Sequence, residues 1–178
     1  MTGDILGKMH VKLRFEAVYR EHWRKIYNYI YGRLLSAADA EEVTADVFIA
    51  AWENWEKYDA SRAKITTWLG TIAHNKVNDY FRKAYRRKEL SVAEFPEPMQ
   101  PTQAARAEGS FDDPASERTY AILQQLTEDE RNLLEMRYTL DMDNDEVAAV
   151  LGATANAVSH RYRRLLDKCR KISEKNFS

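Results

Sequence analysis

The chain has 178 residues, of which 44% are hydrophobic and 31% are charged, and its formal net charge is -1. This composition excludes a disordered chain and fits a folded protein of one domain or two small ones. The single cysteine, Cys169, cannot form an internal disulfide, and no apolar run approaches the roughly 20 residues needed to cross a bilayer. Because 6 Gly and 4 Pro give few turn signals, the sequence predicts an all-α protein. The single cysteine and the lack of a signal-peptide pattern predict a reducing, cytosolic compartment.

Three helices are predicted in the first half of the chain, which we assign to one helical domain, residues 13–90. Apolar side chains recur at three- and four-residue steps over about 13–34, which predicts the first helix. Ser36 is expected to cap the second helix, which extends to about Trp55. The third is predicted over about 66–88 and becomes basic toward its C-terminal end.

The composition changes after residue 90. All four prolines of the chain fall between residues 96 and 114, and helical periodicity stops there. We therefore expect a flexible linker rich in proline and acidic residues over 91–114, joining two small domains. The alternative is a long surface loop inside a single domain.

The second half, residues 115–173, is predicted to contain a helix-turn-helix. A helix over about 115–125 is followed by Thr127 and Glu130, which form a capping-box pattern for the next helix. Asp143 is then expected to cap a short helix, Gly152 to end it, and Thr154 to cap the last helix. Two short helices joined by a tight turn containing glycine define the motif.

Charge is sorted along this half of the chain. Residues 126–153 contain 2 Lys or Arg and 8 Asp or Glu, a net charge of -6, whereas residues 154–171 contain 6 and 1, a net charge of +5. The second helix of a helix-turn-helix enters the DNA major groove, so its polar and basic residues are expected to contact duplex DNA. The acidic stretch is expected to face away from DNA or to contact a basic protein. The alternative is that the basic helix is an ordinary solvated surface. The expected DNA contacts are Thr154, Asn156, Ser159, His160, Arg161, Arg163, Arg164 and Lys168.

A second basic cluster closes the third predicted helix, where Arg82, Lys83, Arg86, Arg87 and Lys88 alternate with Tyr80, Phe81 and Tyr85. Basic side chains that follow a phosphate backbone, together with aromatic side chains that stack on bases, suit single-stranded or opening DNA. For Tyr80 and Phe81 we favour the alternative of a place in the core. The same holds for Trp52, Trp55 and Trp68.

Catalysis and metal binding are not expected. The four histidines are scattered, and the sequence has no HExxH motif, no nucleophile elbow and no glycine-rich phosphate loop. Asp141, Asp143 and Asp145 have the spacing of the first calcium ligands of an EF-hand, but Glu146 replaces the required glycine and Gly152 the final glutamate. We therefore expect no metal and no cofactor.

Taken together, the two halves resemble bacterial sigma factors of the extracytoplasmic-function (ECF) group. The matching segments are "AEEVTADVFIAAW", "WLGTIAHN" with the Asp79 and Arg82 that follow, "LTEDERNLLEMRY" and "DEVAAVLGATANAVSHR". The chain departs from the common pattern at Ala45, where a glutamine is usual, and at Asp141, where a glycine is usual. It also departs in the residues of the recognition helix.

The resemblance implies a dissociable subunit of RNA polymerase that directs promoter recognition, DNA opening and transcription initiation. It implies that the second helix docks on the clamp helices of the β′ subunit through Glu41, Glu42, Asp46, Phe48 and Trp52. The third helix and the loop before it would read the minus-ten element, where one base is flipped out. The residues implied there are Lys64, Asn75, Asp79, Arg82, Lys83, Arg86 and Arg87.

The C-terminal domain would bind the minus-thirty-five element and the flap of the β subunit. An anti-sigma factor that clamps both domains is a further implied partner, and it could hold the protein near the membrane instead of at the nucleoid. Two other functions stay open: a stand-alone helix-turn-helix regulator of transcription and a protein-interaction adaptor.

Overall fold

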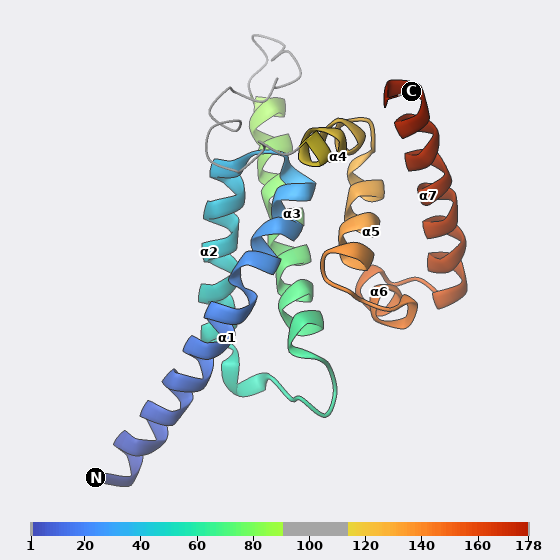
Figure 1. Ribbon diagram of the computed structural model, residues 1–178. Helices are drawn as coiled ribbons and strands as arrows, with labels where there is room; N and C mark the ends of the chain where they lie inside the picture. Colours follow the sequence, from blue (N-terminus) through green and yellow to red (C-terminus); the bar gives the residue numbers. More distant parts are fainter. Residues whose placement is uncertain (1, 91–113, 178) are drawn as a thin grey trace.

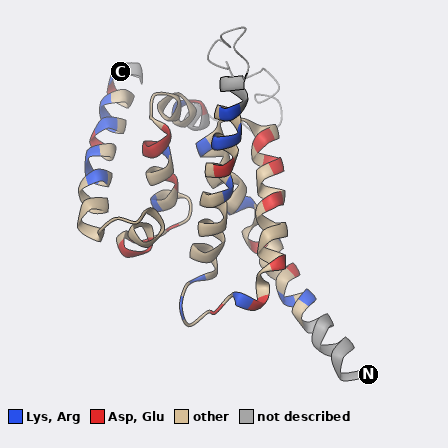
Figure 2. Ribbon diagram, turned by 180° about the vertical axis from the view of Figure 1, so that it is seen from behind, with Lys and Arg blue, Asp and Glu red and all other residues tan. Residues whose placement is uncertain are grey.

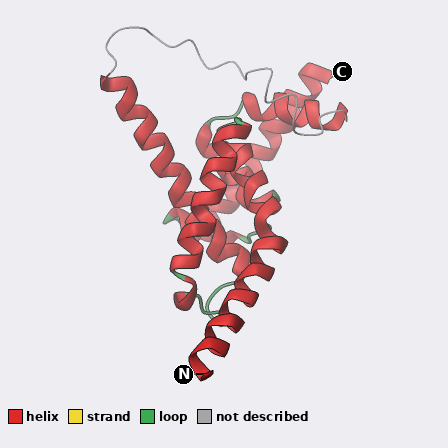
Figure 3. Cartoon of the chain, turned by 90° about the vertical axis from the view of Figure 1, so that its left-hand side faces the viewer, coloured by secondary structure: helices red, strands yellow, loops and turns green. Residues whose placement is uncertain are grey.

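The computed structural model describes the backbone of residues 2–90 and 114–177, and the side chains of residues 11–86 and 117–175. Every regular element in these ranges is a helix, as Figure 3 shows, so the predicted all-α class is confirmed. The expected linker lies outside the described residues except for Pro114, which is the first residue of a helix.

The N-terminal half is a bundle of three helices: α1 (Thr2–Leu34), α2 (Ala37–Glu53) and α3 (Ile65–Leu90). A short 3-10 turn, η1 (Trp55–Lys57), follows α2. Ser36 caps α2 as predicted, its hydroxyl accepting a hydrogen bond from the Asp39 amide. The helices bury one apolar stripe each, and the fully buried residues include Ile26, Ile30, Val47, Leu69 and Val77.

Helix α1 begins eleven residues before the predicted start at residue 13. The prediction relied on apolar periodicity, which begins near Phe15, the first of the described α1 side chains (from residue 11 on) that lies in the core. The turns before it project beyond the other helices in Figure 1. A helix needs no apolar partner to continue into solvent once its first turns are formed, so periodicity alone underestimates its length.

The C-terminal half contains four helices: α4 (Pro114–Gln124), α5 (Glu128–Tyr138), α6 (Asn144–Leu151) and α7 (Ala155–Phe177). The predicted capping box is confirmed, because the Glu130 amide donates to the Thr127 hydroxyl (3.3 Å) and the Thr127 amide donates to the Glu130 carboxylate (2.9 Å). This box satisfies two amides at the start of α5 and defines where α5 begins.

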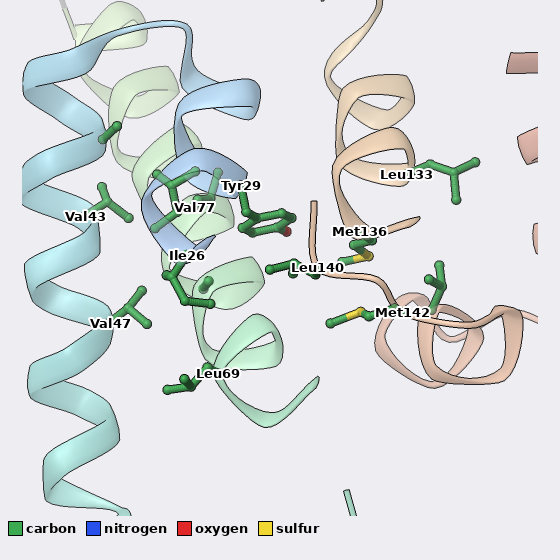
Figure 4. Packing of buried hydrophobic residues seen from close by; sticks show 14 of the residues in the cluster. Ile26, Tyr29, Val43, Val47, Leu69, Val77, Leu133, Met136, Leu140 and Met142 are labelled. Carbon is green, nitrogen blue, oxygen red and sulfur yellow. The ribbon is translucent and has the colours of Figure 1, made fainter. Parts of the chain in front are cut away.

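The two bundles pack against each other, with α1 next to α5 and α3 next to α6 (Figure 1). Figure 4 shows Leu140 and Met142, from the connection between α5 and α6, lying between the two bundles. Gly70 on α3 permits this approach, since a methyl group there would lie 2.5 Å from Met142 Cε and 2.8 Å from Leu140 Cδ1. The buried residues of the two halves thus form one continuous cluster.

Two residues near the short helix α6 have left-handed backbone conformations: Asp141, with φ of 53°, and Gly152, with φ of 62°. Aspartate tolerates this conformation better than most residues, which explains how Asp141 can stand where the ECF pattern usually has glycine. Gly152 ends α6 as predicted.

We expect Gly152→Ala to destabilise the protein by about 1–2 kcal/mol, because an alanine in the left-handed region brings its Cβ too close to the backbone. No other atom lies within 4 Å of the added methyl group, so the loss will come from the backbone alone. Urea unfolding measures it. Gly152→Asn should lose less, and equal losses for the two variants would contradict the explanation.

Glu135 of α5 is buried beside Gly32 of α1. Burial raises the pKa of its carboxyl from 4.5 to about 7, although the Thr139 hydroxyl donates a hydrogen bond to it. Since the pKa is higher in the folded chain than in the unfolded one, the folded chain binds the proton more tightly. The contribution of Glu135 to the free energy of unfolding should therefore be largest below about pH 4.5, and it should be lost as the pH rises through about 7.

We expect Glu135→Gln to stabilise the protein at pH 8 by up to about 3 kcal/mol and to have little effect at pH 5. Burial and the neighbouring Arg33 lower the pKa of His74, which gives that residue the opposite pH dependence. Comparing the variant with the wild type at each pH isolates Glu135. The same gain at both pH values would show that ionisation is not the cause.

Candidate nucleic-acid interface

The helix-turn-helix is held together by local hydrogen bonds and a small buried contact. Asp143 and Glu146 form a second capping box: the Glu146 amide donates to the Asp143 carboxylate (2.8 Å), and the Asp143 amide donates to the Glu146 carboxylate (2.9 Å). The sequence predicted Asp143 as the cap but did not predict that Glu146 takes part. Val147 and Val158, both 0% exposed, pack α6 against α7 beside the small Ala148. This contact orients the exposed face of α7 relative to α6.

The outer face of α7 carries most of the residues predicted to contact duplex DNA. Asn156, His160, Arg161, Arg163 and Arg164 are exposed, and Ser159 is half-buried. The Thr154 hydroxyl accepts a hydrogen bond from the Ala157 amide (3.2 Å), so Thr154 is the N-cap that the sequence predicted. Val158 and Leu165 face inward on the opposite side of the helix. The structure therefore gathers these polar and basic side chains on one surface.

Lys168 differs from the other predicted contacts. Its ammonium group lies 2.5 Å from the Glu130 carboxylate, which also closes the capping box of α5. Arg161, Arg164 and Lys168 line a shallow groove between α5 and α7. Among the described contacts, Glu130 forms an ion pair with Lys168 and none with the two arginines. The Lys168 charge is therefore partly neutralised within the protein and is less available to a phosphate than those two arginines.

A second basic surface lies on α3. Asn75, Arg82, Lys83 and Arg86 are exposed, whereas Asp79 is half-buried and ion-paired with Arg82. The side chain of Arg87 lies outside the described residues. Figure 2 shows this group of basic residues near the C-terminal end of α3, separate from the basic residues of α7. The two predicted DNA-binding surfaces are thus distinct patches on different helices.

The aromatic residues of this cluster divide as expected. Tyr80 and Phe81 are half-buried and pack against the core, edge to face at 5.8 Å. Tyr85 is 66% exposed and stands among the basic side chains. Tyr85 is therefore the aromatic residue of this cluster that is best placed to contact a base.

The loop before α3 is shaped by aromatic residues whose joint role the sequence did not indicate. The rings of Trp55 and Tyr58 stack at 5.6 Å, and Trp68 packs on both at 6.1 and 5.1 Å. The Tyr58 hydroxyl also donates to the Ala63 carbonyl (3.2 Å). This aromatic group holds the loop that ends at Lys64.

Local hydrogen bonds stiffen the same loop. The amide and the hydroxyl of Ser61 donate to one Asp59 oxygen at 2.8 and 2.7 Å. These bonds to the charged form lower the pKa of Asp59. An aspartate followed two residues later by serine is a turn signal that sequence reasoning could have used.

Helix α2 presents the acidic residues predicted to dock on polymerase. Glu41, Glu42 and Asp46 are exposed, and Trp52 is 46% exposed, so the expectation that Trp52 belongs to the core is wrong. Phe48 is only 4% exposed and lies in the core, which removes it from any docking surface. Its neighbour Ile49, 57% exposed, is the apolar residue that the surface offers instead.

Within the described residues, no three His, Cys, Asp or Glu side chains are grouped closely enough to hold a metal ion. No helix among the described residues is both long and apolar enough to cross a membrane.

Two family models match the chain: Sigma-70 region 2 over residues 18–87 and Sigma-70 region 4 over residues 116–169. The ECF RNA polymerase sigma factor RpoE of Cereibacter sphaeroides is 30% identical over 161 residues, which cover 88% of this chain and 87% of the relative. The chain belongs to the ECF group of RNA polymerase sigma factors. SigK of Mycolicibacterium vanbaalenii, another ECF sigma factor, is 27% identical over 87% of this sigma factor and 81% of its own length.

Two solved structures share the fold of this sigma factor. RpoE in complex with the anti-sigma factor NepR from Bartonella quintana has a TM-score of 0.72 and 16% identity, covering 92% of this chain and 98% of that one. CnrH in complex with the cytosolic domain of CnrY has a TM-score of 0.67 and 22% identity, with coverages of 93% and 90%. The region 2 match spans most of α1 to α3, and the region 4 match spans most of α4 to α7.

Proposed function

We propose that this ECF sigma factor divides promoter recognition between its two halves. The N-terminal half docks on the β′ clamp helices through Glu41, Glu42, Asp46, Ile49 and Trp52, and α3 reads and opens the minus-ten element. The α7 surface binds the minus-thirty-five element, and the C-terminal half contacts the β flap. The observation that carries this proposal is that one chain presents two separate exposed basic surfaces, on α3 and on α7.

The chemistry of each surface suits its proposed DNA. The exposed face of α7 carries several arginines, with Asn156 and His160 near the N-terminal end, the end that meets base edges in a helix-turn-helix. Exposed Tyr85 among arginines and lysines on α3 suits stacking on an unpaired base. We assign no catalytic role and no cofactor to either surface.

We also propose that an anti-sigma factor regulates this chain, since both solved neighbours are complexes, one with an anti-sigma factor and one with the cytosolic domain of CnrY. Such a partner would keep the sigma factor away from polymerase. In the cytoplasm the protein would then be divided between the nucleoid and its inhibitor, which could hold it near the membrane.

The test is whether the purified protein co-elutes with bacterial core RNA polymerase and makes it initiate on a library of promoter fragments. We expect specific transcripts, and the aligned start sites will give both promoter elements. If the protein instead binds a duplex site alone, ignores polymerase and gives no transcripts, it is a stand-alone regulator and the proposal is wrong.

A further inference from the structure

A cavity of about 550 Å³ is walled by α1 of the N-terminal half and by α4, α5 and α7 of the C-terminal half. Sites for small molecules in proteins have volumes of about 300–1,000 Å³, so this cavity is large enough for one. Gly32 and Leu123 in its lining are buried, whereas Tyr138 and Leu166 are exposed, so the cavity opens to solvent. None of the residues proposed above to contact DNA or polymerase is among those that line it.

The one charged side chain among the described residues of this lining is that of Glu135, which is 8% exposed. Its carboxylate lies so close to Gly32 that any side chain at that position would collide with it. The carboxylate accepts a hydrogen bond from the Thr139 hydroxyl, and no described lysine, arginine or histidine forms an ion pair with it. A carboxylate buried without a cation is unfavourable to ionise, so the cavity has a negative charge that its own walls do not neutralise.

Aromatic and aliphatic side chains form most of the remaining lining: Tyr31, Tyr120, Tyr138, Ile122, Leu123, Leu134 and Leu166. The Tyr31 ring is held by stacking on the Tyr27 ring at 6.1 Å. Burial, with Tyr120 and Tyr27 as neighbours, raises the pKa of Tyr31 to about 12, so Tyr31 is a neutral phenol at physiological pH. Because neutral aromatic rings attract organic cations and aliphatic side chains pack on apolar groups, this lining suits a cation that carries an apolar body.

We propose that this cavity binds a small organic cation, a protonated amine on an apolar or aromatic body, with the ammonium group at Glu135 and the body against the tyrosine and leucine side chains. The N–H groups of an ammonium ion are the donors that a carboxylate accepts most strongly. An inorganic cation would leave the apolar walls without a contact, and an anion would be repelled by the carboxylate. The inference goes beyond the proposed promoter recognition and does not depend on it.

Ionisation of Glu135 gives the binding a pH dependence. Burial raises the pKa of its carboxyl to about 7, and the cation binds the ionised form. Affinity for an amine should therefore increase at least about 10-fold between pH 5.5 and pH 8, a range in which the amine itself stays protonated. The other titratable groups that face the cavity are phenols and one thiol: Tyr31 of α1, Tyr120 of α4, Tyr138 of α5 and Cys169 of α7. Tyr29 of α1 also lies near Glu135, and burial raises its pKa to about 12.

The experiment titrates the free full-length protein with 2-phenylethylamine in a calorimeter, and with 2-phenylethanol and 3-phenylpropanoate as neutral and anionic compounds of similar shape. At pH 8 we expect a Kd of about 0.1–1 mM for the amine, as is usual for a ligand of this size, and at least about 10-fold weaker binding of the other two. At ten times its Kd, the amine should raise the Tm by about 3–5 °C.

Cys169 reports whether the amine occupies this cavity. It is the one cysteine of the chain, it lines the cavity, and burial raises the pKa of its thiol. At constant pH, amine at ten times its Kd should slow the reaction of Cys169 with iodoacetamide about 5- to 10-fold, because the reaction then depends on the small fraction of unoccupied protein. An unchanged rate would place the bound amine elsewhere and overturn the inference.

Glu135→Gln removes the charge and keeps the shape of the side chain. This variant should bind the amine at least about 10-fold more weakly at pH 8, lose the pH dependence, and bind 2-phenylethanol as the wild type does. Glu117→Gln is the matched control, since Glu117 is an exposed carboxylate of α4 that does not line the cavity. Tyr138→Ala is a second variant, and we expect it to weaken amine binding about 3- to 5-fold. Tyr138 is 82% exposed, so its replacement should leave the fold intact.

The inference is wrong if the wild type does not bind the amine, if all three compounds bind alike, or if Glu135→Gln binds the amine as the wild type does. An equal loss for Glu117→Gln would indicate general attraction to an acidic surface and would also overturn it. Nα-acetyl-lysine amide distinguishes the remaining occupant. If that compound binds as tightly as 2-phenylethylamine, the cavity takes a lysine side chain of a protein partner, and the small-molecule assignment is wrong.

Discussion

Replacing Arg161 and Arg164 with glutamate should weaken binding to the upstream promoter duplex on the order of 100- to 1000-fold. Both side chains are exposed on the outer face of α7, and each reversal removes one phosphate contact and adds a repulsion. The slope of log affinity against log salt concentration should become less steep by about 2. Fluorescence anisotropy with a promoter duplex, titrated over a range of salt concentrations, measures both effects.

Binding to core polymerase should stay nearly unchanged in this variant, because neither arginine is among the residues proposed to dock on the β′ clamp helices, which lie on α2. Arg24→Glu with Lys175→Glu is the matched control, since it makes the same change in net charge at exposed positions outside both surfaces. If the control loses as much DNA affinity, the effect is one of overall charge. If the Arg161 and Arg164 variant loses polymerase and DNA together, the division of labour between the halves is wrong.

The second large effect concerns Glu128. We expect Glu128→Gln, on α5, to weaken the packing of the two halves against each other by about 3–5 kcal/mol, because it leaves the guanidinium of Arg33, on α1, buried without its carboxylate. The Arg33 side chain is 0% exposed and that of Glu128 is 31% exposed. The loss cannot exceed the free energy that holds the halves together, since separation returns Arg33 to water. Urea unfolding followed together with the radius of gyration measures the change.

The double variant Arg33→Met with Glu128→Met provides the control for this pair. Replacing both charges with apolar side chains leaves no buried charge unpaired and is often neutral or stabilising. We expect the double variant to be compact and at least about 2 kcal/mol more stable than Glu128→Gln. A double variant as unstable as the single one would show that packing at these positions, and not the ion pair, holds the contact.

Features that depend on neighbours in the sequence were predicted well. Ser36, Thr127, Asp143, Thr154 and Gly152 all occupy the helix ends assigned to them. Caps are made by hydrogen bonds that span three or four residues, so the necessary information is local. The same reasoning identified the helix-turn-helix, because its signals are two caps, one glycine and a short apolar period.

Features that depend on which way a helix faces were predicted less well. Phe48 and Trp52 both lie on the apolar period of α2, yet Phe48 is buried and Trp52 is 46% exposed. Periodicity locates an apolar stripe but not its edges, which depend on how wide a surface the neighbouring helices cover. Lys168 was likewise grouped with the free basic residues of α7, although Glu130, 38 positions away, pairs with it.

The sequence by itself determined the helices, their caps, the helix-turn-helix and the family, because each depends on short-range patterns. Only the tertiary structure decided how the acidic segment is used. The partners of Arg33 and Lys64 are Glu128 and Glu146, 95 and 82 positions away, and no periodic pattern links residues so distant. Whether an acidic helix faces water, a partner or its own chain is decided by packing between elements, which brings such residues together only after each helix has formed.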